Sequence, residues 1–226
     1  MELSTIEQAL DALRAGKPVL VADADDRENE GDAIISAELA SPEWIAWMVR
    51  HTTGFLCVPM EESRANALEL PLMTVQNRDP HGTKYTITVD ATNRISTGVS
   101  AADRANTAHV LADPLSTPGD LIRPGHMLPL RANAGGVRVR PGHTEATVDL
   151  LKLAGMNPVG VIGEMVSEDG EMMRLPELIE TGKKYDLPVV TIEQLVQYLE
   201  THAIVMDDNP DNRIRFEAEA NVPTTH

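Results

Sequence analysis

The sequence is poor in cysteine and in aromatic residues: Cys57 is its one cysteine, and Phe, Trp and Tyr make up 3% of its 226 residues. A single cysteine excludes an internal disulfide, so folding does not require an oxidising compartment. No apolar run approaches the length of about 18 residues that a membrane-spanning helix needs, and the N-terminus lacks the basic and apolar regions of a secretory signal. We therefore expect a cytoplasmic globular protein without a membrane partner.

Positive charge is also scarce. The 19 Lys and Arg residues face 35 Asp and Glu residues, which gives a net charge of −16. A surface of this sign repels phosphate backbones, so we expect no nucleic-acid partner. Divalent cations are favoured instead, and an anionic small molecule can still bind where arginines and helix N-termini gather.

Short apolar runs alternate with amphipathic stretches along most of the chain. Ser4-x-x-Glu7 predicts a capping box for a first helix that stops at Gly16. Further helices are predicted at 41–49, 100–113, 143–153, 176–185 and 191–198. Strands are predicted at 18–22, 32–37, 54–59, 85–90, 127–131, 159–166, 172–175 and 187–191, with a further short run at 137–139 after the turn Gly135-Gly136.

This order predicts an α/β (mixed α+β) fold, a single compact domain with mixed sheets flanked by helices. The domain is predicted to cover residues 1–206. From Asp207 the sequence DDNPDN is typical of a linker, and residues 207–226 are predicted to form a polar tail.

An acidic loop follows the first predicted strand. Residues 23–32 read DADDRENEGD, in which six of ten residues are Asp or Glu. Crowded carboxylates repel one another unless they are solvated, paired with Arg27 or neutralised by a cation, and Mg²⁺ suits such a loop because it takes few protein oxygens. Both a solvated surface loop and a magnesium site fit the residues. The position after a strand favours a ligand site.

A four-residue motif occurs twice, as Arg123-Pro124-Gly125-His126 and as Arg140-Pro141-Gly142-His143. Each Pro-Gly pair predicts a turn that presents an arginine and a histidine, which is suitable for binding an anion and for proton transfer. The second copy leads into a predicted helix, whose free N–H groups form a ready phosphate site. Two ordinary Pro-Gly turns are the alternative.

Glu164 and Cys57 lie in apolar strands. A carboxylate in such a strand either faces solvent or is partly buried with a raised pKa, and the alternation of the strand does not decide between the two. Cys57 fits a small buried hydrophobic residue better than a nucleophile. The residues together indicate an enzyme that acts on a small phosphorylated metabolite with the help of a divalent metal.

Four collinear motifs carry a resemblance to a known family. DDRENEGD at 25–32, TGVSAADR at 97–104, RPGHMLPLRA at 123–132 and RPGHTEATVDL at 140–150 resemble 3,4-dihydroxy-2-butanone 4-phosphate synthase. The resemblance implies a lyase of riboflavin biosynthesis that converts D-ribulose 5-phosphate to L-3,4-dihydroxy-2-butanone 4-phosphate and formate. It also implies Mg²⁺ or Mn²⁺ as the cofactor, with two ions per site, and a homodimer with the site near the subunit interface.

The resemblance also assigns roles to residues. It implies that Glu28 and His143 ligate the metal and contact the substrate. It implies four catalytic residues, with His126 and Glu164 as the essential acid/base residues and with Asp32 and Cys57 beside them. Asp32 and Glu164 are also implied to contact the substrate, Asp32 at its hydroxyls. The remaining implied substrate contacts are Arg27 and the phosphate clamp Arg140, Pro141, Gly142, His143 and Thr144. The acidic loop is expected to be mobile without a cation and to close over substrate, and residues 76–84 are expected to form a loop on the substrate side.

Residues 216–226, FEAEANVPTTH, resemble the opening of a GTP cyclohydrolase II domain. Three explanations stay open: a shortened piece of a fused protein, a natural form that has lost the partner domain, and an unstructured tail whose similarity is due to chance. Two alternatives to an active synthase stay open. One is a catalytically idle module kept for dimerisation or for supporting a cyclohydrolase. The other is a related Mg²⁺-dependent enzyme that acts on a different phosphorylated sugar.

Overall fold

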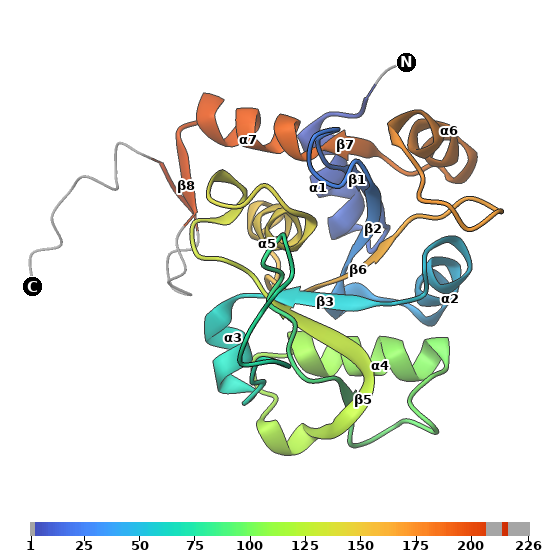
Figure 1. Ribbon diagram of the computed structural model, residues 1–226, viewed down its shortest axis with the longest axis vertical. Coiled ribbons are helices and arrows are strands. Elements are labelled where there is room, and N and C mark those ends of the chain that lie inside the picture. The colour runs from blue at the N-terminus through green and yellow to red at the C-terminus, as the bar shows by residue number, and fades with distance from the viewer. Residues whose placement is uncertain (1–2, 207–213, 217–226) are drawn as a thin grey trace, which may run out of the picture.

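Seven strands form one mixed sheet in the computed structural model, which describes residues 3–206 and 214–216 (Figure 1). The order across the sheet is β4 (Val89–Ala91), β5 (Leu121–Arg131), β3 (Cys57–Met60), β6 (Gly160–Glu164), β2 (Gly31–Ser36), β1 (Val19–Ala22) and β7 (Val189–Thr191). β1 is parallel to β7 and β3 is parallel to β5, and the other pairs are antiparallel. The predicted mixed α/β fold is confirmed.

Helices cover both faces of this sheet (Figure 1). On one face lie α1 (Ile6–Arg14), α5 (His143–Leu153) and α7 (Ile192–Thr201). On the other face lie α2 (Pro42–His51), α4 (Ala101–Ala112) and α6 (Leu175–Tyr185). Shorter elements are α3 (Glu62–Ala67) and the 3₁₀ helices η1 (Ala37–Leu39), η2 (Pro118–Asp120) and η3 (Gly136–Arg138).

The strands read as continuous apolar runs because both faces of the sheet are buried. In β1, Leu20 and Ala22 pack with α2, α4 and α6, whereas Val19 and Val21 pack with α1, α5 and α7. In β2, Ile34 lies on the α5 face. Asp32 therefore lies on that face too, two residues earlier in the strand.

Helix starts follow the predicted capping chemistry with one shift. The capping box of α1 is formed by Thr5 and Gln8, one residue later than predicted, and the Ser4 hydroxyl instead accepts a hydrogen bond from the Val189 N–H at 3.1 Å. Ser41 caps α2, with proline at the first helical position. Thr191 and Gln194 form the predicted capping box of α7.

Three local predictions are wrong. Residues 137–139 do not continue as an extended run, because Gly135 and Gly136 have φ values of 88° and 62° and start the 3₁₀ helix η3. Residues 172–175 form a single bridge, Val166 to Met172, in place of a strand. The motif 123–126 is not a separate turn: it lies within β5, in the stretch between the pairs Asp90–Ile122 and Val89–Met127 where the register against β4 shifts.

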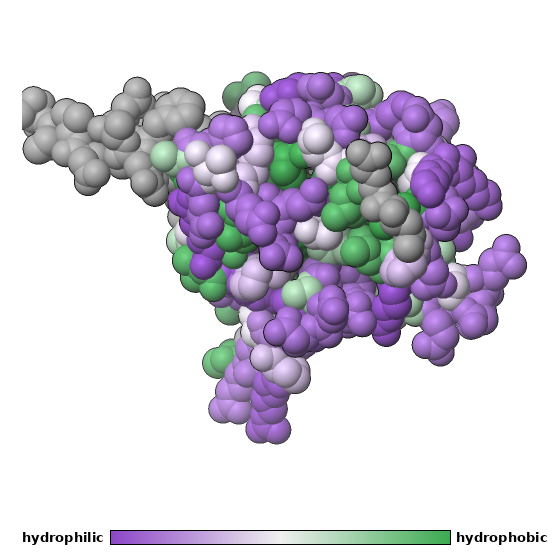
Figure 2. Space-filling view, turned by 90° about the horizontal axis from the view of Figure 1, so that it is seen from above, coloured by the Kyte–Doolittle hydropathy of each residue, from purple (hydrophilic) through white to green (hydrophobic). Residues whose placement is uncertain are grey.

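At the end of the described chain, β8 (Ile204–Met206) pairs with β9 (Ile214–Phe216) as an antiparallel two-stranded sheet. The rest of the predicted tail, 207–213 and 217–226, lies outside the described residues, so the domain boundary at 206 stays a prediction. Within the described residues, none of the helices is long and apolar enough to cross a bilayer. The face over α6 and α7 is largely hydrophilic, with smaller hydrophobic areas between (Figure 2).

Candidate active site

The sheet places two acidic side chains side by side. In the register of β2 and β6, Asp32 lies directly opposite Glu164. The acidic loop leaves the end of β1 and returns at the start of β2, and α5 begins above it with His143. These elements enclose an open cavity of about 450 Å³. Its lining comprises Arg27, Glu28, Glu30, Asp32, Cys57, Thr83, Tyr85, Leu130, Arg140, His143, Thr144, Ile162 and Glu164.

Asp23 organises the acidic loop. Its side chain is fully buried, and its Oδ2 accepts hydrogen bonds from Arg27 Nη1 at 3.0 Å and from the Glu28 N–H at 3.1 Å. Its Oδ1 accepts a third from the Glu30 N–H at 2.8 Å. The premise that the loop needs a cation for order is therefore incomplete, because one of its own carboxylates already holds it. The expected mobility of the loop stays a prediction.

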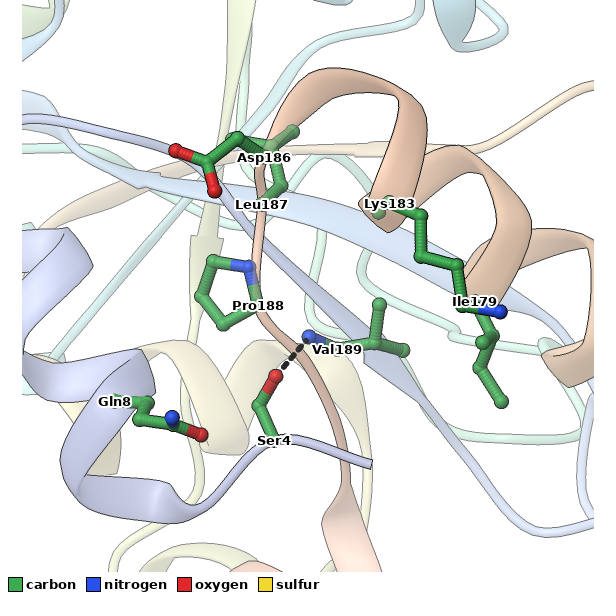
Figure 3. Close-up of a pocket in the computed structure, with 9 residues that line it drawn as sticks. Ser4, Gln8, Ile179, Lys183, Asp186, Leu187, Pro188 and Val189 are labelled. Carbon is green, nitrogen blue, oxygen red and sulfur yellow. Dashed lines mark hydrogen bonds between the residues drawn. The ribbon is translucent and has the colours of Figure 1, made fainter. Parts of the chain in front are cut away.

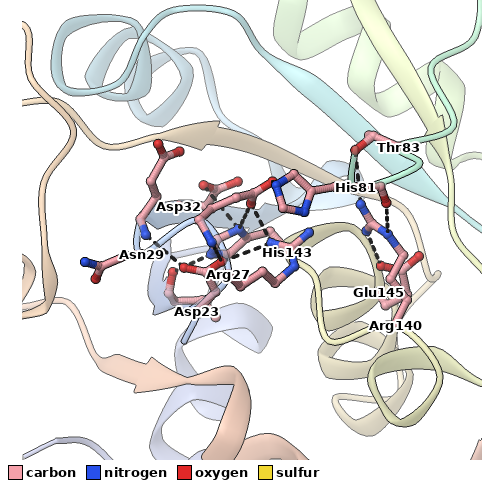
Figure 4. Close-up of polar contacts among 12 residues, drawn as sticks. Asp23, Arg27, Asn29, Asp32, His81, Thr83, Arg140, His143 and Glu145 are labelled. Atoms are coloured by element: carbon pink, nitrogen blue, oxygen red, sulfur yellow. Dashed lines mark hydrogen bonds and ion pairs between the residues drawn. The ribbon is translucent and has the colours of Figure 1, made fainter. Parts of the chain in front are cut away.

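Glu28, Asp32 and His143 converge in the cavity. Figure 4 shows Asp32 and His143 there, beside Arg27 and Asp23. His143 Nε2 lies 3.1 Å from the Val21 carbonyl oxygen, which can only accept, so Nε2 carries a proton. The other ring nitrogen, Nδ1, lies 3.7 Å from Oε2 of Glu28 and 3.7 Å from Oδ1 of Asp32. Nδ1 is thus the nitrogen that the local structure turns toward the two carboxylates.

The charges in this cluster are strongly coupled. Burial raises the pKa of Asp32 to about 7, against the opposing effect of the His143 charge. The His143 imidazole, together with Arg27, holds the pKa of Glu28 at about 2 despite burial. Burial lowers the pKa of His143, but the charges of Asp32 and Glu28 outweigh it and raise this pKa to about 9. At neutral pH the imidazole therefore holds the proton that a cation would displace.

The cluster fits a divalent cation on two structural observations. Ligand atoms of Asp23, Glu28 and His143 all lie within 4.8 Å of one another. Oδ1 of Asp32 is buried and has no hydrogen-bond partner among the described residues, which is costly unless another group satisfies it. Carboxylate oxygens with one imidazole are suitable ligands for Mg²⁺ or Mn²⁺. Sequence reasoning missed Asp23 as a member of this cluster, although the acidic loop contains it.

The second copy of the repeated motif forms the far wall of the cavity. Gly142 caps α5, and a side chain there would collide with Arg140 Nη1 at 2.4 Å and with Arg27 Nη2 at 2.9 Å. Both guanidinium groups thus pass over the start of α5, close to its first N–H groups. Thr144 lines the cavity, whereas Pro141 is exposed and shapes the turn. This arrangement has the donors that a phosphate group requires.

Arg140 is already engaged by its neighbours (Figure 4). It contacts buried Glu145 Oε2 through Nη1 at 2.7 Å and Thr83 Oγ1 through Nη2 at 3.0 Å. Its Nε donates to the His81 carbonyl at 3.1 Å. The segment 76–84, which was expected on the substrate side, is thereby tied to the motif. A phosphate bound here would compete with that segment for the Arg140 donors.

Glu164 is half-buried and lines the cavity, so of the two alternatives drawn from the strand pattern the structure shows partial burial. Its Oε2 accepts a hydrogen bond from Thr53 Oγ1 at 2.6 Å. Cys57 is buried, and burial raises the pKa of its thiol well above the ordinary value. Its Sγ lies 3.7 Å from the Phe55 carbonyl oxygen. Cys57 therefore lines the cavity as a neutral thiol, in a form unsuited to nucleophilic attack.

His126 is not among the residues that line this cavity. It lies on β5 with its ring 2.7 Å from the Asp90 carboxylate, in the part of the sheet next to β4. Arg123 of the same motif donates to the backbone carbonyls of Pro118, Leu121 and Leu68, so it binds the chain rather than a ligand. The first copy therefore does not form the anion clamp that its residues suggested.

Another hollow, of about 720 Å³, lies between the start of α1 and the end of α6 (Figure 3). Its polar groups serve local structure: Ser4 accepts from the Val189 N–H, and Lys183 pairs with Glu180 at 2.9 Å. The chemistry of the acidic loop and of α5 is absent from its lining. The cavity beside β2 and β6 is therefore the better candidate for an active site.

Known proteins resemble this chain over most of its length. The family model for 3,4-dihydroxy-2-butanone 4-phosphate synthase matches residues 7–198. The riboflavin biosynthesis protein RibBA of Salinispora arenicola is 50% identical over 222 residues, which cover 98% of this chain and 51% of that protein. The chain thus spans about half the length of the curated relatives it matches.

Solved structures agree with this assignment. A 3,4-dihydroxy-2-butanone 4-phosphate synthase in complex with two magnesium ions has a TM-score of 0.85 and 43% identity, covering 88% of this chain and 98% of that one. The synthase of Candida albicans has a TM-score of 0.82 and 50% identity, covering 88% of this chain and 99% of that one. The chain belongs to the 3,4-dihydroxy-2-butanone 4-phosphate synthase family.

Proposed function

We propose that this chain converts D-ribulose 5-phosphate to L-3,4-dihydroxy-2-butanone 4-phosphate and formate, a step of riboflavin biosynthesis. One observation carries the proposal: the cluster of Glu28, Asp32 and His143 shares a cavity with the arginine-lined start of α5. A phosphorylated ketose presents a phosphate at one end and neighbouring oxygens at the other. The cavity offers a matching pair of sites for these two ends.

Glu28 and His143 are the residues that would hold Mg²⁺ or Mn²⁺, with two ions per site as the further proposal. The metal, when bound, polarises substrate oxygens and lowers the cost of removing a proton from carbon. His143 presents Nδ1 to it because Nε2 is fixed by the Val21 carbonyl. The fully buried Asp23 keeps Glu28 in place through the loop backbone.

The remaining cavity residues would orient the substrate and move protons. Arg140 and Thr144 would bind the phosphate at the start of α5, after segment 76–84 releases Arg140. The pKa of Asp32, raised to about 7, suits a group that takes up and returns a proton near neutral pH. Glu164, opposite Asp32, is proposed as the second acid/base group on this side.

His126 is proposed as a further acid/base group, although it lies outside the cavity enclosed by one chain. The proposed homodimer offers one route to a complete site, because a second copy can bring groups that a single chain does not. The cytoplasmic location and the resemblance of the tail at 207–226 to the start of a GTP cyclohydrolase II domain stay predictions.

The test is formate release from D-ribulose 5-phosphate by purified protein, with Mg²⁺ and with EDTA in parallel. We expect metal-dependent formate in amounts equal to a four-carbon phosphate. D-xylulose 5-phosphate serves as the matched substrate control and should give none. Absence of formate from folded, Mg²⁺-loaded protein would overturn the proposal in favour of an idle module, and faster turnover of another pentulose phosphate would indicate a different substrate.

A further inference from the structure

We propose that Asp90 is a positioning residue for His126. Its carboxylate keeps the ring proton of His126 on Nδ1, so that Nε2 is the atom that exchanges protons with the substrate. The inference deepens the proposed function and rests on it, because it concerns the proton transfer assigned there to His126. Asp90 lies outside the repeated motif and on a different strand from His126.

The Asp90 carboxylate holds His126 at two points. Oδ1 accepts the His126 backbone N–H at 2.9 Å, and Oδ2 lies 2.7 Å from Nδ1 of the ring. An ionised carboxylate can only accept, so Nδ1 carries a proton in this contact. The side chain of Asp90 is 7% exposed and that of His126 is 47% exposed. One ring nitrogen is thus fixed inside the protein, whereas Nε2 has no hydrogen bond among the described residues.

The backbone is shaped to let this contact form. Val89 pairs with Met127 and Asp90 with Ile122, so the register shifts here and residues 123–126 of β5 lie between the two pairs. An irregularity of this kind redirects side chains. Gly125 lies against the β4 backbone so closely that a Cβ would be 2.0 Å from the Val89 carbonyl carbon. Close approach of the two strands at this point therefore requires glycine immediately before His126.

Gly98 closes the pair from a third segment. A Cβ on Gly98 would lie 2.1 Å from Asp90 Oδ2 and 2.8 Å from His126 Nδ1, so any larger residue would separate the two. Asp103 holds this segment in place by accepting hydrogen bonds from Ser96 and from the Gly98 N–H. The motif 97–104, which had no assigned role, thus packs directly on the carboxylate–imidazole contact.

The sharpest test is Asp90→Asn, which keeps the shape and changes the proton. The His126 backbone N–H still needs an acceptor, so the amide oxygen stays there and the amide NH₂ faces Nδ1. Nδ1 then has to accept, and the ring proton moves to Nε2. We expect the ¹⁵N NMR signature of His126 to change from the Nδ1–H to the Nε2–H tautomer. We expect kcat to fall about a thousandfold with little change in KM.

Asp113→Asn is the matched control, because it removes the same charge at a loop position where an amide oxygen can still accept from the Leu115 N–H. Mn²⁺ binding should be unchanged in both variants. A merely structural Asp90 would lower the melting temperature and leave the tautomer of the folded protein as it was. If Asp90→Asn does not fold, the tautomer of His126 is compared between the unsubstituted protein and Gly98→Ala, in which the added methyl group separates Asp90 from His126. The inference then requires the Nδ1–H form in the unsubstituted protein and its loss in Gly98→Ala.

Besides an unchanged tautomer in folded Asp90→Asn, two results would overturn the inference: an Nε2–H tautomer in the unsubstituted protein, or Asp90→Asn with a reversed tautomer and kcat within threefold of the original. The tautomer is read without substrate. An unsubstituted protein that shows the Nδ1–H form and releases no formate would therefore refute the proposed function and leave the Asp90 contact standing.

Discussion

The same four residues, Arg-Pro-Gly-His, adopt two unrelated structures in this molecule. At 123–126 they lie within strand β5, and at 140–143 they end a turn and start helix α5. The difference comes from the residues on the C-terminal side of each copy. Met127 to Arg131 pairs with β3 and β4, whereas residues 144–153 have the spacing of a buried helix. The motif supplies residue types, and its flanks decide the backbone that presents them.

The two histidines that end the motif are fixed through opposite ring nitrogens. His143 uses Nε2 on the Val21 carbonyl and leaves Nδ1 facing Glu28 and Asp32. His126 uses Nδ1 on the Asp90 carboxylate and leaves Nε2 open. One ring is thereby suited to metal ligation among carboxylates, and the other to proton exchange.

The largest effect is expected from removal of each ring in turn. His143→Ala should abolish both Mn²⁺ binding and formate release, because it removes a ligand, whereas His126→Ala should lower turnover about a thousandfold and keep Mn²⁺ binding. Mn²⁺ titration followed by electron paramagnetic resonance separates the two. Loss of Mn²⁺ binding in folded His126→Ala would contradict the assignment of different roles to the two histidines.

The proton held by His143 predicts a pH dependence that His126→Ala should leave unchanged. Because its pKa is raised to about 9, metal must displace a proton below that pH. Apparent Mg²⁺ affinity should therefore rise about tenfold per pH unit between pH 6.5 and 9, and isothermal titration calorimetry in two buffers should detect the released proton.

The same shift has a consequence for stability. Because the pKa of His143 is higher in the folded than in the unfolded protein, its protonation stabilises the fold. This stabilisation is complete at a pH below the pKa of the unfolded state and is lost as pH rises through about 9. The melting temperature of the metal-free protein should thus fall from pH 6.5 to 9, and Mg²⁺ should restore it. A flat profile would contradict a buried, protonated His143.

A smaller effect is expected at Arg174. From the start of α6, its guanidinium donates to the Glu28 and Asn29 carbonyls of the acidic loop. Arg174→Ala should weaken Mg²⁺ binding about tenfold, because the acidic loop loses the hydrogen bonds that hold its backbone from outside the cavity. Arg50→Ala, which removes an exposed arginine on α2, is the control and should not change the affinity. Equal Mg²⁺ affinities in the two variants would show that Arg174 does not help to position the metal ligands.

The smallest effect is expected at Cys57. Since its thiol is buried and neutral, Cys57→Ala should keep kcat within about threefold and cost about 1 kcal/mol of unfolding free energy through the lost packing. Formate assays and urea titration measure the two quantities. A loss of kcat comparable to that of His126→Ala would show that the sulfur takes part in the reaction.

The residue types of the site could be predicted from the sequence, but its pairings could not. Glu28, Asp32 and His143 stood in recognisable motifs, and the structure gathers them in one cavity. The pairing of Asp32 with Glu164 depends on the register of two strands far apart in the chain, which no local pattern encodes. Asp90 was missed for the same reason, because its contact with His126 depends on the register shift between β4 and β5.

The local predictions were wrong where the tertiary fold overrode a local sequence signal. Pro124-Gly125 is a common turn pair, yet it lies within β5, in the stretch where the register against β4 shifts. The fold class was predictable because alternation of buried strands with capped helices is a property of the whole chain, and it survives errors at 137–139 and 172–175.

The central place of β6 has a consequence for the order in which the molecule assembles. β6 joins β3 to β2, so before it is in place β4-β5-β3 and β2-β1-β7 are two unconnected sheets (Figure 1). During synthesis most of the chain emerges before Glu164 does, and the edges of β2 and β3 wait unpaired. Such long-range closure makes for slow folding. Of the three central strands, the last to be synthesised is also the one that carries a carboxylate into the cavity, so the step that joins the two halves of the sheet also brings Glu164 to the site.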